Sequence, residues 1–165
     1  MNEPHILLAS GNVWRLKRNL SGILDRRALI ALEHEISRNV VQLYRLAVSH
    51  KSFAMRADKR LWRQRISRLY YAAYTGSRAI RLQVFGDYST DSSDHKKVAA
   101  LPDDFPNRLI FVNELPMLRE DRNLSDYDHE ARREDLSKSV DDWLDFVNNF
   151  MFNVKVYLRG RGVHL

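Results

Sequence analysis

The sequence predicts an all-α fold of about one domain. Apolar residues recur at intervals of three and four, as on one face of a helix, and no segment shows the alternation that is typical of a strand. The chain has 165 residues and a hydrophobic share of 44%, which is enough to bury a core without covalent cross-links. It contains no cysteine, which excludes disulfides and cysteine-based zinc sites.

Three long helices follow from the apolar spacing. The first series of apolar residues covers residues 29–47, the second covers 62–84 and the last covers 136–157. The second series ends at Gly86, and the last ends at Gly160. Glycine favours the left-handed position that follows many helices, so both residues are predicted to end a helix.

A shorter helix is predicted between the second and the last. Residues 86–104 are rich in Ser, Asp, Gly and Pro and are therefore predicted to form mostly loop. Pro106 suits the first turn of a helix, because its missing N–H has no partner there in any case. Pro116 should kink or interrupt this helix, and we expect the helix to end near residues 119–122.

Four helices with moderately short connections, and no strand pattern, predict an antiparallel bundle. The chain is divided into an N-terminal extension, residues 1–20, and a helical domain, residues 21–165, whose first helix Ser21 or Asp25 would cap. No apolar stretch approaches the roughly 20 residues that cross a bilayer. The N-terminus also lacks the basic cluster of a secretory signal. We therefore expect a soluble, cytoplasmic protein with no membrane contact.

The net charge of +6 favours polyanionic partners such as RNA, although mild basicity also serves solubility alone. Lys59, Arg60 and Arg63 at the start of the second helix, and Arg119 further on, are candidate contacts to an RNA backbone. The alternative is that these residues form the solvated face of amphipathic helices. No glycine-rich phosphate loop and no metal-ligand spacing occurs, so neither a cofactor nor a metal site is predicted.

The segment LREDRNLSDYDHEARRED, residues 118–135, carries the candidate chemistry. If it is helical, Arg122, Asp126 and His129 share one face, because steps of four and seven residues return to the same side. If it is a turn, this geometry does not hold. The alternative interpretation is an i,i+4 ion pair of Arg122 with Asp126. Ser125 and Asp128 would then form a capping box that opens the last helix, with His129 exposed.

Three segments resemble HEPN domain proteins. RLYYAAYTGSRAI (68–80) is similar to the aromatic-rich helix that opens such domains, and SDHKKV (93–98) is similar to the histidine-containing loop that follows it. LREDRNLSDYD (118–128) is similar to the family's stretch in which an arginine precedes an Ala- or Ser-Asp-Tyr tripeptide. The resemblance covers about the C-terminal two-thirds of the chain and implies a four-helix bundle of HEPN type.

The resemblance also implies an activity. Many HEPN proteins carry an arginine, then a polar residue, then a histidine after four to six intervening residues, and Arg122, Asn123 and His129 match this pattern with six. The family is rich in metal-independent endoribonucleases that act as homodimers, with toxin or defence roles. The expected partners are therefore RNA, a second copy of the chain and an antitoxin resembling nucleotidyltransferases.

The residue types suit the cleavage of RNA, which can use its own 2′-hydroxyl as the nucleophile. A histidine exchanges protons near neutral pH, so His129 is the candidate acid or base. The permanent charge of Arg122 can hold the phosphate and stabilise the charge that develops on it. Asn123 would position one of these groups, with Asp126 and Tyr127 in support.

Two other readings of the chain remain open. The first is a HEPN module without catalysis, which binds nucleotide, RNA or a protein partner. The second is a helical adaptor whose basic face has no role in binding nucleic acid. In the loop, His95 is interpreted as a structural residue that caps a helix end. Tyr70 and Tyr74, four residues apart, are interpreted as core or dimer-interface residues, with base stacking as the alternative.

Overall fold

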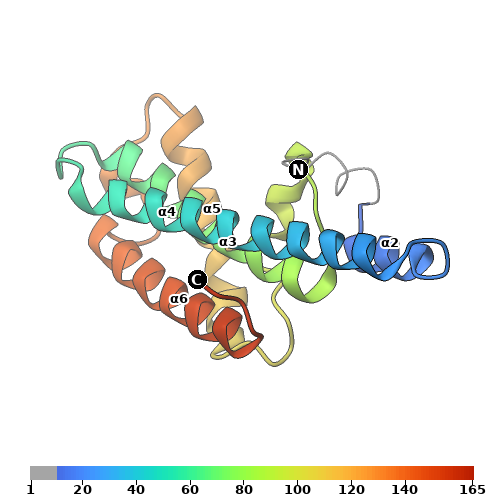
Figure 1. Ribbon diagram of the computed structural model, residues 1–165. Helices are drawn as coiled ribbons and strands as arrows, with labels where there is room; N and C mark the ends of the chain where they lie inside the picture. The colour runs from blue at the N-terminus through green and yellow to red at the C-terminus, as the bar shows by residue number, and fades with distance from the viewer. Residues whose placement is uncertain (1–10) are drawn as a thin grey trace.

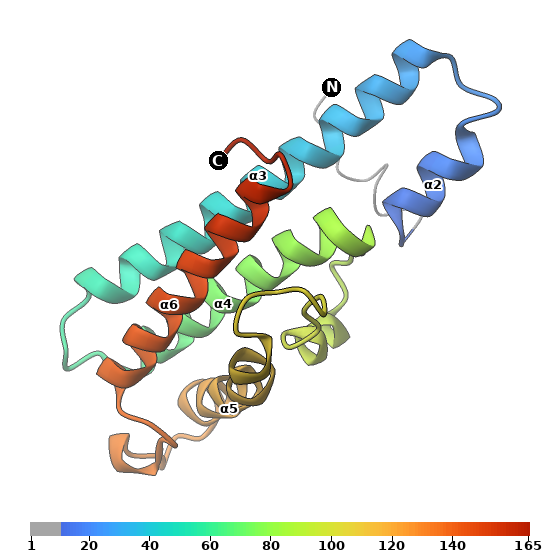
Figure 2. The ribbon, with the colours of Figure 1, turned by 90° about the horizontal axis from the view of Figure 1, so that it is seen from below.

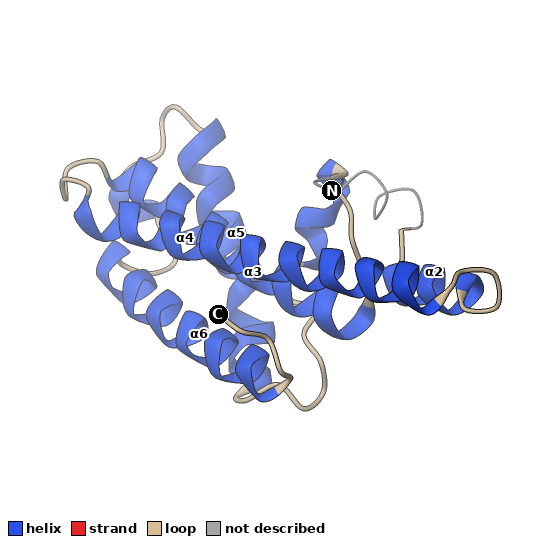
Figure 3. Ribbon diagram, in the orientation of Figure 1, coloured by secondary structure: helices blue, strands red, loops and turns tan. Residues whose placement is uncertain are grey.

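The computed structural model describes residues 11–165, and this part of the chain is helical without a strand (Figures 1 and 3). The all-α prediction is confirmed. Residues 1–10 of the predicted N-terminal extension lie outside the described residues. In residues 11–165, no helix has the length and apolar character to cross a membrane. The α-helices are α2 (Val13–Leu20), α3 (Arg26–Arg56), α4 (Trp62–Phe85), α5 (Arg108–Tyr127) and α6 (Val140–Gly160), and the 3₁₀ helices are η1 (Ser92–Lys97) and η2 (Arg133–Asp135).

Helix α4 is the centre of the fold, and α3, α5 and α6 each pack against it (Figure 2). Buried Arg65 near the start of α4 donates to the carbonyl of Ala54 near the end of α3, 3.1 Å away, so these helices run in opposite directions. The same guanidinium lies 3.3 Å from Asp141 at the start of α6, so α4 and α6 run in the same direction. Helix α5 crosses α3 and α4 at a steep angle (Figures 1 and 2).

Small residues on α4 let α6 approach closely. A Cβ atom added to Gly76 would lie 3.0 Å from Sδ of Met151 and 3.5 Å from the ring of Phe150. Ala72 and Ala73 beside it are fully buried. Trp143, Phe150 and Phe111 fill the space between α6 and α5, together with the other large buried side chains. The core therefore surrounds α4. The neighbouring helices α5 and α6 contact each other through aromatic rings.

Helix α5 is longer than the sequence predicts. It does not end near residues 119–122 but continues through Pro116 to Tyr127, so that prediction was wrong. It also begins after Pro106, at Arg108. Proline in a helix costs about 3 kcal/mol, because it removes a hydrogen bond and crowds the preceding turn. Leu115 and Leu118 on either side of Pro116 are fully buried against the core, and this burial holds the helix together.

The last helix begins four residues later than its apolar pattern predicts, at Val140, with Ser139 as the N-cap. The preceding segment is fixed by the buried carboxylate of Asp121 on α5. This carboxylate accepts hydrogen bonds from the backbone N–H of Ser137 at 3.0 Å and from Nε1 of Trp143 at 2.6 Å. One acidic side chain therefore joins α5 to the start of α6.

The predicted helix end at Gly86 is confirmed, since this residue has a φ of 70° and caps α4. Residues 12–14, which include the first turn of α2, bind to this end of α4. The N–H of Val13 donates to the carbonyl of Gly86 at 2.8 Å, and Nε1 of Trp14 donates to the carbonyl of Gln83 at 3.1 Å. The side-chain amide of Asn12 donates to the carbonyl of Phe85 at 2.8 Å. These donors satisfy carbonyls that a helix end leaves without partners.

Replacing Gly86 with alanine should lower the free energy of unfolding by about 1–3 kcal/mol, because a left-handed residue with a Cβ is strained. The added Cβ would also lie 2.7 Å from the ring of Trp14. Gly160→Ala is the matched control, since no atom lies within 4 Å of the position of its Cβ. Urea denaturation followed by circular dichroism measures both variants. Equal stability of the two would contradict the assigned role of Gly86.

Candidate functional site

Arg122 is the centre of the candidate site. It projects from α5 towards α4, where its Nη2 donates to the hydroxyl of Tyr71 at 2.7 Å. Its Nη1 donates to the side-chain oxygen of Asn123 at 3.1 Å. The guanidinium carbon lies 5.3 Å from the ring centre of Tyr71, 5.6 Å from that of Tyr70 and 5.1 Å from that of Tyr127. The cation is therefore held between aromatic rings of two helices.

The predicted pairing of Arg122 with Asp126 is present. Nε of Arg122 lies 2.8 Å from Oδ2 of Asp126, although the N–H does not point at the oxygen, so the contact is an ion pair and not a hydrogen bond. Burial works against the charge, but Tyr71 and Asp126 outweigh it and raise the pKa of the Arg122 guanidinium. The side chain is 12% exposed. A guanidinium has five N–H donors, and the bonds to Asn123 and Tyr71 leave one N–H on each of Nη1 and Nη2 without a partner among the described residues.

His129 lies apart from this cluster. Helix α5 ends at Tyr127 with Asp128 as its C-cap, so His129 does not share the helical face of Arg122, contrary to the expectation for a helical segment. Its side chain is 92% exposed and lies 3.9 Å from Glu130. In residues 11–165, no hydrogen bond or ion pair joins it to Arg122. The geometry therefore leaves His129 free in solvent beside the helix end.

The predicted capping box of Ser125 and Asp128 was wrong. Ser125 lies inside α5, where its buried hydroxyl donates to the carbonyl of Asp121 at 2.7 Å. Asp128 instead stabilises the turn after the helix, because its carboxylate accepts the N–H groups of Glu130 at 2.9 Å and Ala131 at 3.2 Å. The interpretation failed because α5 is longer than expected and α6 begins later.

Arg63, a predicted RNA contact, binds the turn that carries His129. Its guanidinium donates to four backbone carbonyls. The distances are 2.9 Å to Ser125, 2.6 Å to Asp128, 3.4 Å to His129 and 2.5 Å to Ala131. The planar fork of an arginine suits such a set of acceptors. The structure thus ties the first turn of α4 to the end of α5.

The other predicted substrate-binding residues are more open. Lys59 is exposed and lies 3.6 Å from Asp141. Arg60 is also exposed and pairs with Asp58 at 2.8 Å. Arg119 lies one turn before Arg122 on α5 and is partly exposed. Arg119 is therefore on the same helix as the candidate site, whereas Lys59 and Arg60 lie in the connection between α3 and α4.

Two histidines lie beside the tyrosines of α4, a placement that the sequence did not predict. The ring of His50, on α3, lies 5.7 Å from that of Tyr71, and burial and the charge of Arg68 lower the pKa of its imidazole. The ring of His95, in η1, stacks on Tyr74 with centres 4.1 Å apart. From the sequence, His95 is expected to cap a helix end. Its side chain instead forms a hydrogen bond with the hydroxyl of Tyr70. The tyrosine spacing gave correct core positions for Tyr70 and Tyr74, both buried.

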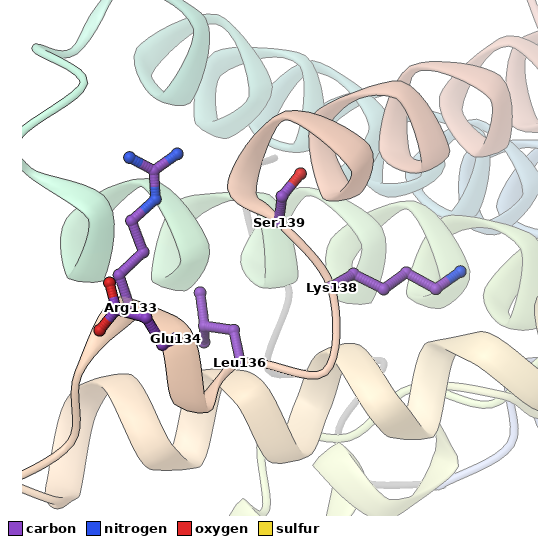
Figure 4. A pocket seen from close by; sticks show the side chains of 5 residues that line it. All are labelled: Arg133, Glu134, Leu136, Lys138 and Ser139. Atoms are coloured by element: carbon purple, nitrogen blue, oxygen red, sulfur yellow. The ribbon is translucent and has the colours of Figure 1, made fainter.

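A shallow depression elsewhere, between η2 and the start of α6, does not gather reactive groups. Figure 4 shows Arg133 and Lys138 pointing to different sides of it, with Leu136 between them. Lys138 pairs with Glu114 and lies over the ring of Trp143, 5.2 Å from its centre. The cluster around Arg122 is therefore the stronger candidate site.

Replacing Arg63 with alanine should loosen the turn that follows α5. Four carbonyls would lose a charged donor, so the amides of Glu130 and Ala131 should exchange with solvent at least about tenfold faster. Hydrogen exchange followed by mass spectrometry or NMR measures this. Arg60→Ala is the matched control, because Arg60 is exposed and pairs only with Asp58 among the described residues. Unchanged exchange in Arg63→Ala would show that the turn does not depend on this clamp.

Comparison with known proteins adds no identification. No family model matches the chain, and neither the curated proteins nor the solved structures gave a match.

Proposed function

We propose that this protein is a metal-independent endoribonuclease of HEPN type that binds an RNA phosphate at Arg122. The observation that carries the proposal is the placement of Arg122, partly exposed and held by Tyr71, Asn123 and Asp126 with donors to spare. A pre-organised arginine of this kind binds phosphate at low cost in side-chain entropy. The net charge of +6 favours the same partner. The proposal includes a HEPN-type bundle over residues 21–165.

In the proposed reaction, the 2′-hydroxyl oxygen attacks the adjacent phosphorus and the bond from phosphorus to the 5′ oxygen breaks. His129 takes the proton from the 2′-hydroxyl, and the 5′ oxygen takes one from solvent. The products are a 2′,3′-cyclic phosphate and a 5′-hydroxyl. Arg122 stabilises the charge that grows on the phosphate, and Asn123 orients its guanidinium.

Association of two copies would bring a second Arg122 and His129 to the same RNA. His129 is 92% exposed, so it is free to reach a phosphate bound by its own chain or by the other. The resemblance to HEPN proteins supports the homodimer, and it supports a toxin or defence role with a nucleotidyltransferase-like antitoxin.

A second candidate function is a HEPN module that binds RNA without cleaving it. It is favoured by one observation, that no hydrogen bond or ion pair joins the His129 side chain to the Arg122 cluster in the described part of the chain. The two functions share the phosphate contact at Arg122 and differ in whether His129 matters.

Pure protein should cleave single-stranded RNA in excess EDTA, and the products should carry cyclic phosphate ends. Arg122→Ala and His129→Ala should each lower the rate at least about 100-fold, because one removes charge stabilisation and the other proton transfer. Denaturing gels and mass spectrometry measure the rate and the ends.

The matched controls are Arg15→Ala on α2 and His34→Ala on α3, which are exposed residues of the same types on other helices. Both should cleave like the original protein. Intact RNA across a range of pH values and salt concentrations, with the protein folded, would rule out the nuclease.

Binding separates the two candidate functions. For a short RNA whose 2′ positions are methylated, Arg122→Ala should weaken binding and reduce the slope of log K against log salt by about one, as the loss of one phosphate contact requires. His129→Ala should leave binding nearly unchanged. Fluorescence anisotropy over a salt series measures this. Binding with no cleavage would select the non-catalytic module, and no salt-dependent binding would select the adaptor.

A further inference from the structure

His95 lies on the same aromatic rings as Arg122. The ring centre of His95 is 5.7 Å from that of Tyr70 and 6.0 Å from that of Tyr71, the two α4 rings over which the guanidinium also lies. Its ring also stacks on that of Tyr74, with centres 4.1 Å apart. Helix α5 and η1 therefore present a cation and an imidazole to one group of tyrosines on α4.

The hydroxyl of Tyr70 sets the tautomer of His95. It lies 2.8 Å from Nδ1, and Tyr70 is fully buried with no other hydrogen-bond partner in residues 11–165. Burial raises the pKa of Tyr70, so the hydroxyl keeps its proton. When His95 is neutral, the hydroxyl donates to Nδ1, its only acceptor among the described residues; when His95 is protonated, Nδ1–H donates to the hydroxyl oxygen instead. Neutral His95 therefore carries its own proton on Nε2.

Nε2 of His95 is open to a ligand. It has no hydrogen-bond partner among the described residues, and it is not among the buried side-chain nitrogens that lack one. The imidazole as a whole is partly exposed. This N–H donor is thus accessible to solvent, on a ring that shares the neighbours Tyr70 and Tyr71 with Arg122.

The surroundings of His95 are positive. Burial is the largest cause that lowers the pKa of its imidazole. Among the charges that lower this pKa further, that of Arg122 is the strongest. Asp94 acts in the opposite direction, but its carboxylate already binds Arg81 at 2.8 Å and 2.5 Å. The titratable and charged groups that face His95 from α4, α5 and η1 are Tyr70, Tyr71, Tyr74, Arg78, Arg119, Arg122 and Asp94.

We propose that His95 and Arg122 bind one RNA phosphate together, and that His95 takes up a proton when the phosphate binds. The inference rests on the phosphate contact at Arg122 proposed above. A phosphate oxygen accepts the Nε2 hydrogen and offsets the charge of Arg122, so it favours the imidazolium. Binding and protonation then strengthen one another. This gives RNA affinity a dependence on pH that comes from η1 and not from the turn after α5.

The sign of the effect follows from linkage. If the pKa of a group is higher in the complex than in the free protein, binding becomes tighter as the pH falls from the higher pKa to the lower one. With a difference of about one pKa unit, RNA should bind roughly fivefold more tightly at pH 5.5 than at pH 7.5. Arg122 keeps its charge between pH 5.5 and pH 7.5, so the change in RNA affinity reports on the protonation of His95.

The experiment uses a short RNA whose 2′ positions are methylated, so that it cannot be cleaved. Its affinity is measured by fluorescence anisotropy at both pH values for the original protein, His95→Asn and the control His34→Asn, an exposed histidine on α3. Asparagine at position 95 can still accept from Tyr70 but lacks an atom at the place of Nε2. We expect the pH dependence to disappear in His95→Asn and to remain in His34→Asn. Thermal melting checks that both variants are folded.

An NMR titration of the ring protons of His95 gives an independent readout. The pKa of His95 should rise when the same RNA is added. Three outcomes decide the matter. Loss of the pH dependence in His95→Asn supports the inference. Its persistence there, or an unchanged pKa of His95, overturns the inference while RNA binding stands. Failure of the original protein to bind RNA overturns the proposed function and the inference together.

Discussion

The buried carboxylate of Asp121 is the constraint on which the position of the candidate site depends. It joins α5 to the start of α6 through Trp143 and Ser137. Arg122, the next residue, points instead to Tyr71 on α4. Successive helical residues lie about 100° apart, so one residue fixes the helix against α6 while its neighbour reaches the tyrosines. Without a fixed α5, the guanidinium would have no defined place on the aromatic rings.

Local patterns in the sequence predicted the helices whose ends are marked by capping residues. Asp25 caps α3 and Gly86 ends α4, as their residue types indicate. The course of α5 could not be predicted in this way, because Pro116 argues for an interruption. Its continuation depends on burial of Leu115 and Leu118 against helices distant in sequence. Tertiary packing therefore outweighed a strong local signal.

The candidate site was only partly predictable. The pairing of Arg122 with Asp126 follows from helical spacing, and the structure shows it. The neighbourhood of Tyr71 and His95 depends on how three segments meet, which no local pattern encodes. Arg63 illustrates the same limit, since a basic residue at a helix start looks like a surface charge. It became a clamp on the backbone because α5 ends beside it.

The contacts at Gly86 have a consequence for the order of events in folding. The last carbonyls of α4 receive their donors from Asn12 and Trp14, about 70 residues earlier in the chain. Such a distant pairing carries a loop-closure cost, so this turn gains its partners only after that loop has closed. Asp87, the next residue, pairs with Lys97 at the end of η1. The docking of the first described helix onto the end of α4 thus depends on closing a long loop, whereas the histidine-bearing loop is held locally, through Asp94, by Arg81 of α4.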